Sequence, residues 1–159
     1  MTERVAAIVP AAGIGQRFGP GTNKPFHLLL DKPLIVWTLE ALQDIDEIEE
    51  IIPVLKESDM ELGVKVFESH NLTKVKRIAT GGKERQDSVY RGLSLLSGKS
   101  ALVLIHDGAR PLIDKDTVRG AINSVPGFDG VISGVPVKDT IKEVEQGVVK
   151  TTLNRGMLW

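Results

Sequence analysis

Short apolar runs alternate with longer amphipathic stretches along most of the chain. The short runs are typical of buried strands, and the longer stretches place apolar residues at helical spacing. This alternation predicts a parallel sheet covered by helices, which is an α/β fold. Asp114 or Asp116 is placed to cap the last predicted helix. The predicted strands cover Arg4–Val9, Glu49–Leu55, Val75–Ala79, Ala101–His106 and Val131–Val135, and the predicted helices cover Leu34–Asp44, Glu57–Asn71, Glu84–Leu96 and Val118–Val125.

The pattern changes near the end of the chain. Thr140–Val144 and Val148–Leu153 are rich in β-forming residues, and Gln146 and Gly147 stand between them. Two such runs around a short glycine-containing turn are typical of a β-hairpin. We therefore predict a hairpin that departs from the α/β layer.

Composition narrows the class of protein. The chain has 159 residues, 42% hydrophobic and 26% charged, which suits one domain over residues 1–159 with a buried core. No apolar run approaches the ~20 residues that cross a bilayer, and the N-terminus does not resemble a signal peptide, so a cytoplasmic protein is expected. The absence of cysteine excludes disulfides, thiolate metal sites and a cysteine nucleophile.

The net charge of −1 provides no general attraction to nucleic acid or to membranes, and neither is expected as a partner. Any anion must therefore bind at local clusters of Lys and Arg. Three loops that carry such cations each follow a predicted strand. Because the carboxyl ends of parallel strands meet at one sheet edge, we expect these loops to form one site.

The first loop runs from Pro10 to Arg17 and is followed by Lys24. Its small residues let backbone N–H groups approach phosphate oxygens, and the two cations could face a triphosphate. The loop lacks the third glycine of the Rossmann fingerprint and the Gly-Lys-Ser/Thr of the P-loop. A tight turn with surface cations is therefore the alternative interpretation.

The second loop, Gly81–Ser88, places two glycines before a predicted helix. Free N–H groups at a helix start could hold a base carbonyl or a phosphate, and Arg85 and Ser88 add side-chain hydrogen bonds. The alternative is a plain turn in which Glu84 and Asp87 favour the helix dipole.

The third loop, His106–Pro111, contains one acidic and one basic side chain. Asp107 could hold Mg²⁺ or a ribose hydroxyl, and Arg110 could contact a second phosphate. The alternative is a structural ion pair between Asp107 and Arg110 beside a buried His106.

Taken in order, these motifs resemble those of the 2-C-methyl-D-erythritol 4-phosphate cytidylyltransferases of the non-mevalonate isoprenoid pathway. The resemblance runs from Val5 to Trp159 and implies a Rossmann-like nucleotidyltransferase fold, with a mostly parallel sheet and helices on both faces. It also implies a projecting β-arm over residues 137–155 that forms a homodimer. The motifs are Pro10-Ala11-Ala12-Gly13-x-Gly15-x-Arg17, Lys24-Pro25, Gly81-Gly82-x-Glu84-Arg85-x-Asp87-Ser88-Val89, His106-Asp107-x-Ala109-Arg110-Pro111, Asp139-Thr140-Ile141-Lys142 and Asn154-Arg155-x-x-Leu158-Trp159.

The resemblance also implies roles for individual residues. The sugar phosphate would attack the α-phosphorus of CTP and expel pyrophosphate, with Mg²⁺ as the divalent cation and no side-chain nucleophile. By their positions in the motifs, Arg17 and Lys24 would stabilise the transition state, Ala11, Ala12, Gly13, Gly82, Arg85, Ser88 and Asp107 would bind the nucleotide, Arg110, Thr140 and Arg155 would bind methylerythritol phosphate, and Asp107 would hold the metal.

Two departures from the family pattern stand out. Asp31 occupies a turn position where glycine is common. The family continues past Trp159 into further sheet and a late Lys, and the chain ends on apolar residues, so we expect a chain that is incomplete at its C-terminus.

Two other functions fit the same loops. A ribitol-5-phosphate cytidylyltransferase shares the loop plan and reaction, although the Ala-Ala-Gly and Gly-Ala-Arg-Pro stretches favour methylerythritol phosphate. An inactive nucleotide-binding fragment is the other alternative. A sugar-1-phosphate uridylyl- or thymidylyltransferase is disfavoured by the Gly-Gly-x-Glu-Arg loop.

Overall fold

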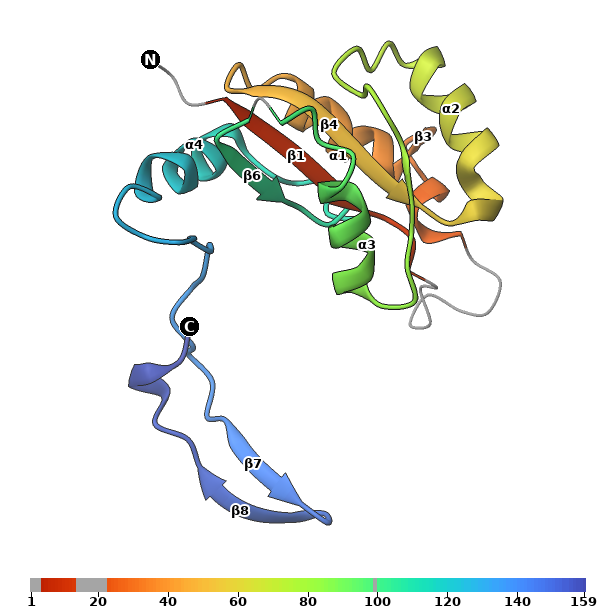
Figure 1. Cartoon of the computed structure of the whole chain (residues 1–159). Coiled ribbons are helices and arrows are strands. Elements are labelled where there is room, and N and C mark those ends of the chain that lie inside the picture. Colours follow the sequence, from red (N-terminus) through yellow and green to blue (C-terminus); the bar gives the residue numbers. More distant parts are fainter. Residues whose placement is uncertain (1–3, 14–22, 99) are drawn as a thin grey trace. The chain divides into compact units, whose positions relative to one another are not determined.

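The computed structural model describes residues 4–13, 23–98 and 100–159. The chain divides into two compact units, Met1–Val118 and Arg119–Trp159. The first unit contains a sheet with helices, and the second contains an antiparallel hairpin (Figure 1). Among the described residues, no helix is both long and apolar enough to cross a membrane.

The sheet of the first unit has four parallel strands in the order β5-β4-β1-β6. The chain runs from the inner strand β1 out to β4 and β5 on one side, and then crosses to β6 on the other side. The strand order therefore reverses beside β1, and ligands of open α/β sheets bind outside the carboxyl ends at such a reversal. The strands are β1 (Val5–Pro10), β4 (Ile48–Leu55), β5 (Ala79–Thr80) and β6 (Leu102–Ile105).

The core lies around β1 and β4. Every side chain of Val5–Val9 is fully buried. Because successive side chains of a strand point to opposite faces, this burial requires cover on both faces of the sheet. Glu50 in β4 is also buried, and it accepts hydrogen bonds from the backbone N–H and the hydroxyl of Ser97 at 3.2 and 2.7 Å, which satisfies its carboxylate.

Helices supply that cover, as the sequence predicts. In Figure 1, α3 (Arg85–Leu93) lies in front of the sheet and α1 (Leu34–Gln43) lies behind it. A Cβ on Gly92 of α3 would press on Ile8 and Val54, so this glycine lets the helix sit directly on the sheet. The helix α2 (Met60–Ser69) follows a short 3-10 turn, η3 (Glu57–Asp59).

The helix α4 (Lys115–Ser124) begins where Asp114 caps it. The Asp114 Oδ1 accepts a hydrogen bond from the Thr117 N–H at 2.8 Å, and Oδ2 accepts one from the Thr117 hydroxyl at 2.6 Å. These are the contacts of an N-cap carboxylate, so Asp114 and not Asp116 caps the helix. The helix starts three residues before the predicted Val118.

A small hairpin connects β1 to α1. It pairs β2 (Leu28–Leu29) with β3 (Lys32–Pro33) and follows the 3-10 turn η2 (Lys24–Phe26). Leu30 and Asp31 form its turn with φ values of 51° and 63°. Positive φ at both positions matches a type I′ turn, and neither residue is a glycine.

Two predicted strands are corrected by the structure. Instead of Val75–Ala79, only Ala79 and Thr80 join the sheet, after one isolated bridge between Ile51 and Val75. Residues 76–78, between the bridge and the strand, are not paired with β4. The expected core strand Val131–Val135 has no regular structure, and Ile132 in it is 96% exposed. A run of β-forming residues becomes a strand only where a neighbouring strand supplies hydrogen bonds, and among the described residues none pairs with 131–135.

The predicted hairpin is confirmed in the second unit. The strand β7 (Lys142–Glu145) pairs antiparallel with β8 (Val148–Thr152). Gln146 and Gly147 form the turn with φ values of 50° and 82°, again type I′. The hairpin falls inside the predicted arm, residues 137–155, and a 3-10 turn, η4 (Arg155–Met157), follows it.

Candidate active site

The first loop continues the line of β1 past Pro10. The Ala11 N–H donates to the Val54 carbonyl at 2.8 Å, and Ala11 is only 6% exposed. This bond anchors the loop to the neighbouring strand β4. Ala12 is half-buried, and Gly13 is exposed. Residues 11–13 therefore place small side chains at the strand end.

The second loop packs against the first. A Cβ on Gly81 would meet the Ala12 Cβ, so glycine is required for the two loops to touch. The Gly82 N–H donates to the Ser88 hydroxyl at 3.1 Å, and that hydroxyl donates to the Glu84 carbonyl at 3.1 Å. Ser88 is 4% exposed, so these two hydrogen bonds come from a buried side chain.

The third loop carries a carboxylate held by two arginines. The Asp107 Oδ1 accepts hydrogen bonds from the Arg85 Nε and Nη2 at 3.1 and 2.9 Å, and Oδ2 lies 2.9 Å from the Arg110 Nε. Arg85 starts α3, so the first pair links the second loop to the third. Asp107 is thus the negative centre of a cationic cluster.

These contacts decide the charge of Asp107. Partial burial raises the pKa of the carboxyl, but the hydrogen bonds and positive charges of Arg85 and Arg110 outweigh it and hold the pKa below its usual value. Burial acts in the other direction on the neighbouring His106, whose pKa is lowered. At neutral pH the loop therefore presents a carboxylate beside an uncharged imidazole.

Residues of all three loops line one pocket of about 240 Å³ at the carboxyl ends of β1, β5 and β6. The sheet topology places it at the reversal beside β1. Its lining combines glycine backbone, the cations Lys83 and Arg85 and the carboxylates of Glu84 and Asp107, and backbone N–H groups and cations are the groups that bind phosphates. The lining residues are Pro10, Ala12, Gly13, Gly82, Lys83, Glu84, Arg85, Ser88 and Asp107.

Most of the predicted nucleotide-binding residues meet at this pocket. Ala11 lies behind the first loop, and Arg110 reaches the cluster through Asp107. Lys24 begins η2 and is half-buried, but it does not line the pocket. Arg17 lies outside the described residues. Thr140 and Arg155 belong to the second unit, where the Arg155 Nη1 donates to the Lys138 carbonyl at 2.9 Å.

Some lining residues were not predicted. Lys83 and Glu84 stand inside the second motif, and a cation directly after a glycine pair was a signal that could have found Lys83. Thr38, on α1, is also tied to the third loop: its hydroxyl donates to the Gly108 carbonyl at 3.0 Å. No sequence signal marks it, because a threonine inside an amphipathic helix is unremarkable.

The donor set bears on the predicted metal. Within the described parts of the chain, no three His, Asp or Glu side chains are grouped to hold a cation. Asp107 supplies one carboxylate, which suits Mg²⁺ only when substrate phosphates and water complete the coordination. Both of its oxygens are paired with arginine, so a metal would share the carboxylate with Arg85 and Arg110.

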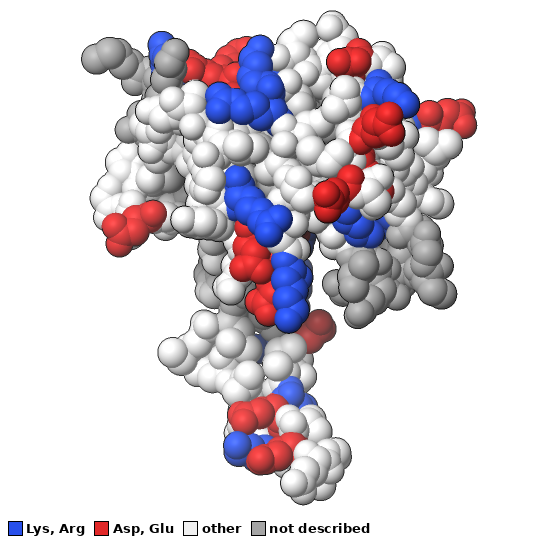
Figure 2. All heavy atoms as spheres, turned by 45° about the vertical axis from the view of Figure 1, so that its right-hand side comes forward, with Lys and Arg blue, Asp and Glu red and all other residues white. Residues whose placement is uncertain are grey.

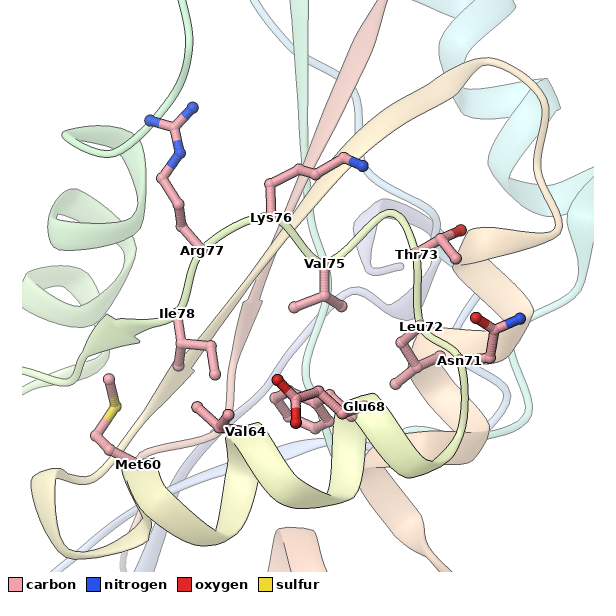
Figure 3. A pocket seen from close by; sticks show the side chains of 11 residues that line it. Met60, Val64, Glu68, Asn71, Leu72, Thr73, Val75, Lys76, Arg77 and Ile78 are labelled. Atoms are coloured by element: carbon pink, nitrogen blue, oxygen red, sulfur yellow. The ribbon is translucent and has the colours of Figure 1, made fainter.

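A second, larger pocket of about 630 Å³ lies away from the strand ends, between α2 and residues 71–78 (Figure 3). The side chains of Val64, Val75 and Ile78 point into the space between α2 and residues 71–78. Those of Lys76 and Arg77 point away from the helix. The pocket therefore presents an apolar interior without inward cations, and it is unsuited to a triphosphate.

Charges on the surface are mixed in sign. On the face shown in Figure 2, basic and acidic side chains lie interspersed. This agrees with the net charge of −1. Attraction for a polyanion is therefore local and depends on side chains such as those of the pocket.

Comparison with known proteins shows the family of the chain. Residues 5–159 match the family model IspD, 2-C-methyl-D-erythritol 4-phosphate cytidylyltransferase. A 2-C-methyl-D-erythritol 4-phosphate cytidylyltransferase of Bacillus cereus is 40% identical over 151 residues, covering 95% of this chain and 66% of the relative. One from Geotalea uraniireducens is 39% identical and covers 98% and 68%. The chain thus spans about two thirds of the length of these relatives.

Solved structures give the same result. A 4-diphosphocytidyl-2C-methyl-D-erythritol synthase from Anaerococcus prevotii superposes with a TM-score of 0.82 at 27% identity, covering 99% of this chain and 67% of that chain. The Francisella tularensis 2-C-methyl-D-erythritol 4-phosphate cytidylyltransferase has a TM-score of 0.70 at 25% identity, covering 95% and 66%. By family model, sequence relatives and fold, this chain belongs to the 2-C-methyl-D-erythritol 4-phosphate cytidylyltransferase family.

Proposed function

We propose that the protein transfers a cytidylyl group from CTP to 2-C-methyl-D-erythritol 4-phosphate and releases pyrophosphate. The observation that carries the proposal is the convergence of three loops, each with its own family motif, on one pocket at the strand ends. Family membership supports the choice of substrates.

The pocket divides into parts that suit a nucleotide. The backbone of Ala12, Gly13 and Gly82 can approach closely because no large side chain stands there. Lys83 and Arg85 bring positive charge to the same rim, where a phosphate would sit. We propose that the base and ribose lie against Gly82 and Ser88, with the phosphates toward the first loop.

The reaction requires positioning more than proton transfer. A phosphate oxygen of the sugar phosphate forms a bond to the α-phosphorus of CTP, and the bond from that phosphorus to the bridging oxygen breaks. The attacking phosphate is already an anion, so no base is needed. Arg17 and Lys24 are proposed to meet the charge that grows on the α-phosphoryl and bridging oxygens.

We propose Mg²⁺ as the divalent cation, held by Asp107 together with the nucleotide phosphates. When bound, the metal neutralises the triphosphate and the leaving pyrophosphate. Arg110, which pairs with Asp107, is proposed to meet the incoming sugar phosphate. Because CTP and phosphorylated intermediates are cytoplasmic metabolites, we place the reaction in the cytoplasm.

The hairpin is proposed to form a homodimer. Its two strands expose Val144, Val148 and Val149 by 55–70%, and an isolated two-stranded hairpin is barely stable in water. Pairing with a second copy would cover these side chains. It would also bring Thr140 and Arg155 of one subunit to the sugar phosphate in the other.

The test is pyrophosphate release from CTP, methylerythritol phosphate and Mg²⁺. We expect turnover by the wild-type chain, and Arg17→Ala or Lys24→Ala to reduce kcat by about 10²- to 10³-fold with unchanged circular dichroism. Lys65→Ala, which removes an exposed cation of α2, is the matched control and should retain full turnover.

Two outcomes would count against the proposal. A preference for ribitol 5-phosphate over methylerythritol phosphate would show that the protein is a ribitol-5-phosphate cytidylyltransferase. CTP binding measured by calorimetry without turnover would indicate a nucleotide-binding module.

A further inference from the structure

A buried hydroxyl on α1 is bonded to the third loop of the pocket. Thr38 is completely buried, and its Oγ1 donates to the Gly108 carbonyl at 3.0 Å, across 70 positions of sequence. The same hydroxyl lies 3.4 Å from the Leu34 carbonyl one turn earlier, where helical threonines usually bond. The contact with Gly108 is the shorter of the two and lies within the usual range of a hydroxyl hydrogen bond.

Gly108 is held from its other side as well. Its N–H donates to the Pro10 carbonyl at 3.0 Å. A Cβ at this position would press on the Ala11 Cβ at 2.9 Å and on Val9. The residue is therefore locked between the end of β1 and the helix α1, with a hydrogen bond at both its amide and its carbonyl.

Asp107 directly precedes this locked residue. His106, on the other side of Asp107, is also anchored to β1, because its N–H donates to the Ile8 carbonyl at 3.0 Å. The backbone on each side of Asp107 is thus tied to β1, and the Thr38 bond also ties it to the helix α1. The Gly108 carbonyl belongs to the peptide that leads through Ala109 to Arg110, so loss of the Thr38 bond would loosen the segment whose Arg110 side chain pairs with the Asp107 carboxylate.

We infer that Thr38 is a positioning residue that orients Asp107 through the Gly108 carbonyl. The inference rests on the proposed function, in which Asp107 contributes to holding Mg²⁺ and the CTP phosphates. Thr38 itself does not line the pocket, so it acts only through the loop. Outer partners of this kind typically change metal affinity or activity about 10- to 100-fold when removed.

The test compares two substitutions of Thr38. Thr38→Val keeps the shape and removes the donor, whereas Thr38→Ser keeps the donor. The affinity for CTP is measured by calorimetry with and without Mg²⁺. We expect Thr38→Val to lower the Mg²⁺-dependent part of the affinity about 10-fold or more, and Thr38→Ser to restore it to within about 3-fold.

Val36→Ala is the control for a loss of stability alone. Val36 is fully buried on the same helix, two residues from Thr38 and so on a different side of it. It should lower the melting temperature and leave the Mg²⁺-dependent CTP affinity unchanged. If Thr38→Val behaves in the same way as Val36→Ala, Thr38 is structural and the inference is wrong.

A second readout is independent of CTP. In the nucleotide-free chain, Thr38→Val should shift the NMR signals of the Gly108 amide and the Arg85 Nε. Gly108 belongs to the third loop, and the Arg85 Nε donates to Asp107 of the same loop. Val36→Ala and Thr38→Ser should not. If the wild-type chain binds no CTP, the proposed function fails, and these shifts still decide whether Thr38 orients the loop.

Discussion

The two units differ in how much of their sequence they bury. In the first unit, the strands β1 and β4 and the helix α1 form a core in which many side chains are completely inaccessible. In the second unit, all of residues 119–159 are exposed or only partly buried. Apolar residues are nevertheless present there, including Ile132, Trp159 and Met157, which are 96, 77 and 79% exposed.

The two units therefore differ in the interactions that stabilise them. The first unit is stabilised by its own apolar burial, and its loops are held by a rigid sheet edge. The second unit buries no apolar side chain, and its hydrogen bonds include the ladder of its hairpin and the pairing of Val137 with Leu158. The pocket at the strand ends is therefore built on the unit with the buried core, and Thr140 and Arg155, which are proposed to reach the sugar phosphate, lie on the exposed one.

The largest expected effect compares one isoleucine from each unit. Ile52→Ala in β4 leaves a cavity in the core and should lower the free energy of unfolding by about 2–5 kcal/mol. Ile132→Ala, at a fully accessible position, should change it by less than about 0.5 kcal/mol. Urea unfolding of both variants measures the contrast. Equal losses would show that residues 131–135 are packed in solution.

A smaller effect is expected from pH. The pKa of Asp107 is lowered in the folded state, so its pairs stabilise the protein above the ordinary carboxyl pKa of about 3.9 and are lost as pH falls through the folded value. A third of the side chain is exposed, so the contribution is at most about 1 kcal/mol.

The measurement is the urea midpoint of wild-type protein and Asp107→Asn between about pH 6 and pH 3. The difference between the two should shrink as the solution is acidified. Asp129→Asn, at an exposed position of the second unit, is the control. A difference that grows toward low pH would contradict the lowered pKa.

The two type I′ turns permit a finer comparison. Leu30 and Asp31 adopt positive φ in the first unit without glycine or asparagine, and Leu30 is 82% exposed. Replacing them together by Asn-Gly should raise the free energy of unfolding by about 0.5–1 kcal/mol, because those residues adopt this geometry at lower cost. Thermal unfolding measures the gain. Leu30→Ala removes the same apolar surface but keeps the strain, and it should give no such gain.

The smallest effect is expected at the other turn. Gln146→Asn should stabilise the hairpin by about 0.5 kcal/mol or less, since Gly147 already occupies the second position. Slower amide exchange of the β7 and β8 ladder would report it, with an unchanged urea midpoint for the first unit. Gly147→Ala should speed the same exchange. A shift of the global midpoint by either change would show that the two units unfold together.

Much of the fold could be predicted from the order of apolar and polar residues. The strands β1 and β4, the helices α1 to α3 and the turn at Gln146 and Gly147 follow from periodicity and turn chemistry alone. Segments with similar local composition were predicted wrongly, because Val75–Ala79 and Val131–Val135 needed a neighbouring strand along their whole length. Whether a segment pairs into a sheet depends on the neighbouring strand, and the sequence of the segment itself does not contain that information.

The sequence by itself determined the chemistry of the loops and their order, because glycines, cations and a carboxylate after successive strands are local features. Only the tertiary structure decided which of them touch. The pairing of Asp107 with Arg85, 22 positions away, depends on both β5 and β6 ending at one sheet edge. The bond from Thr38 to Gly108 depends on α1 crossing behind that edge, and its distance in sequence leaves no pattern to detect.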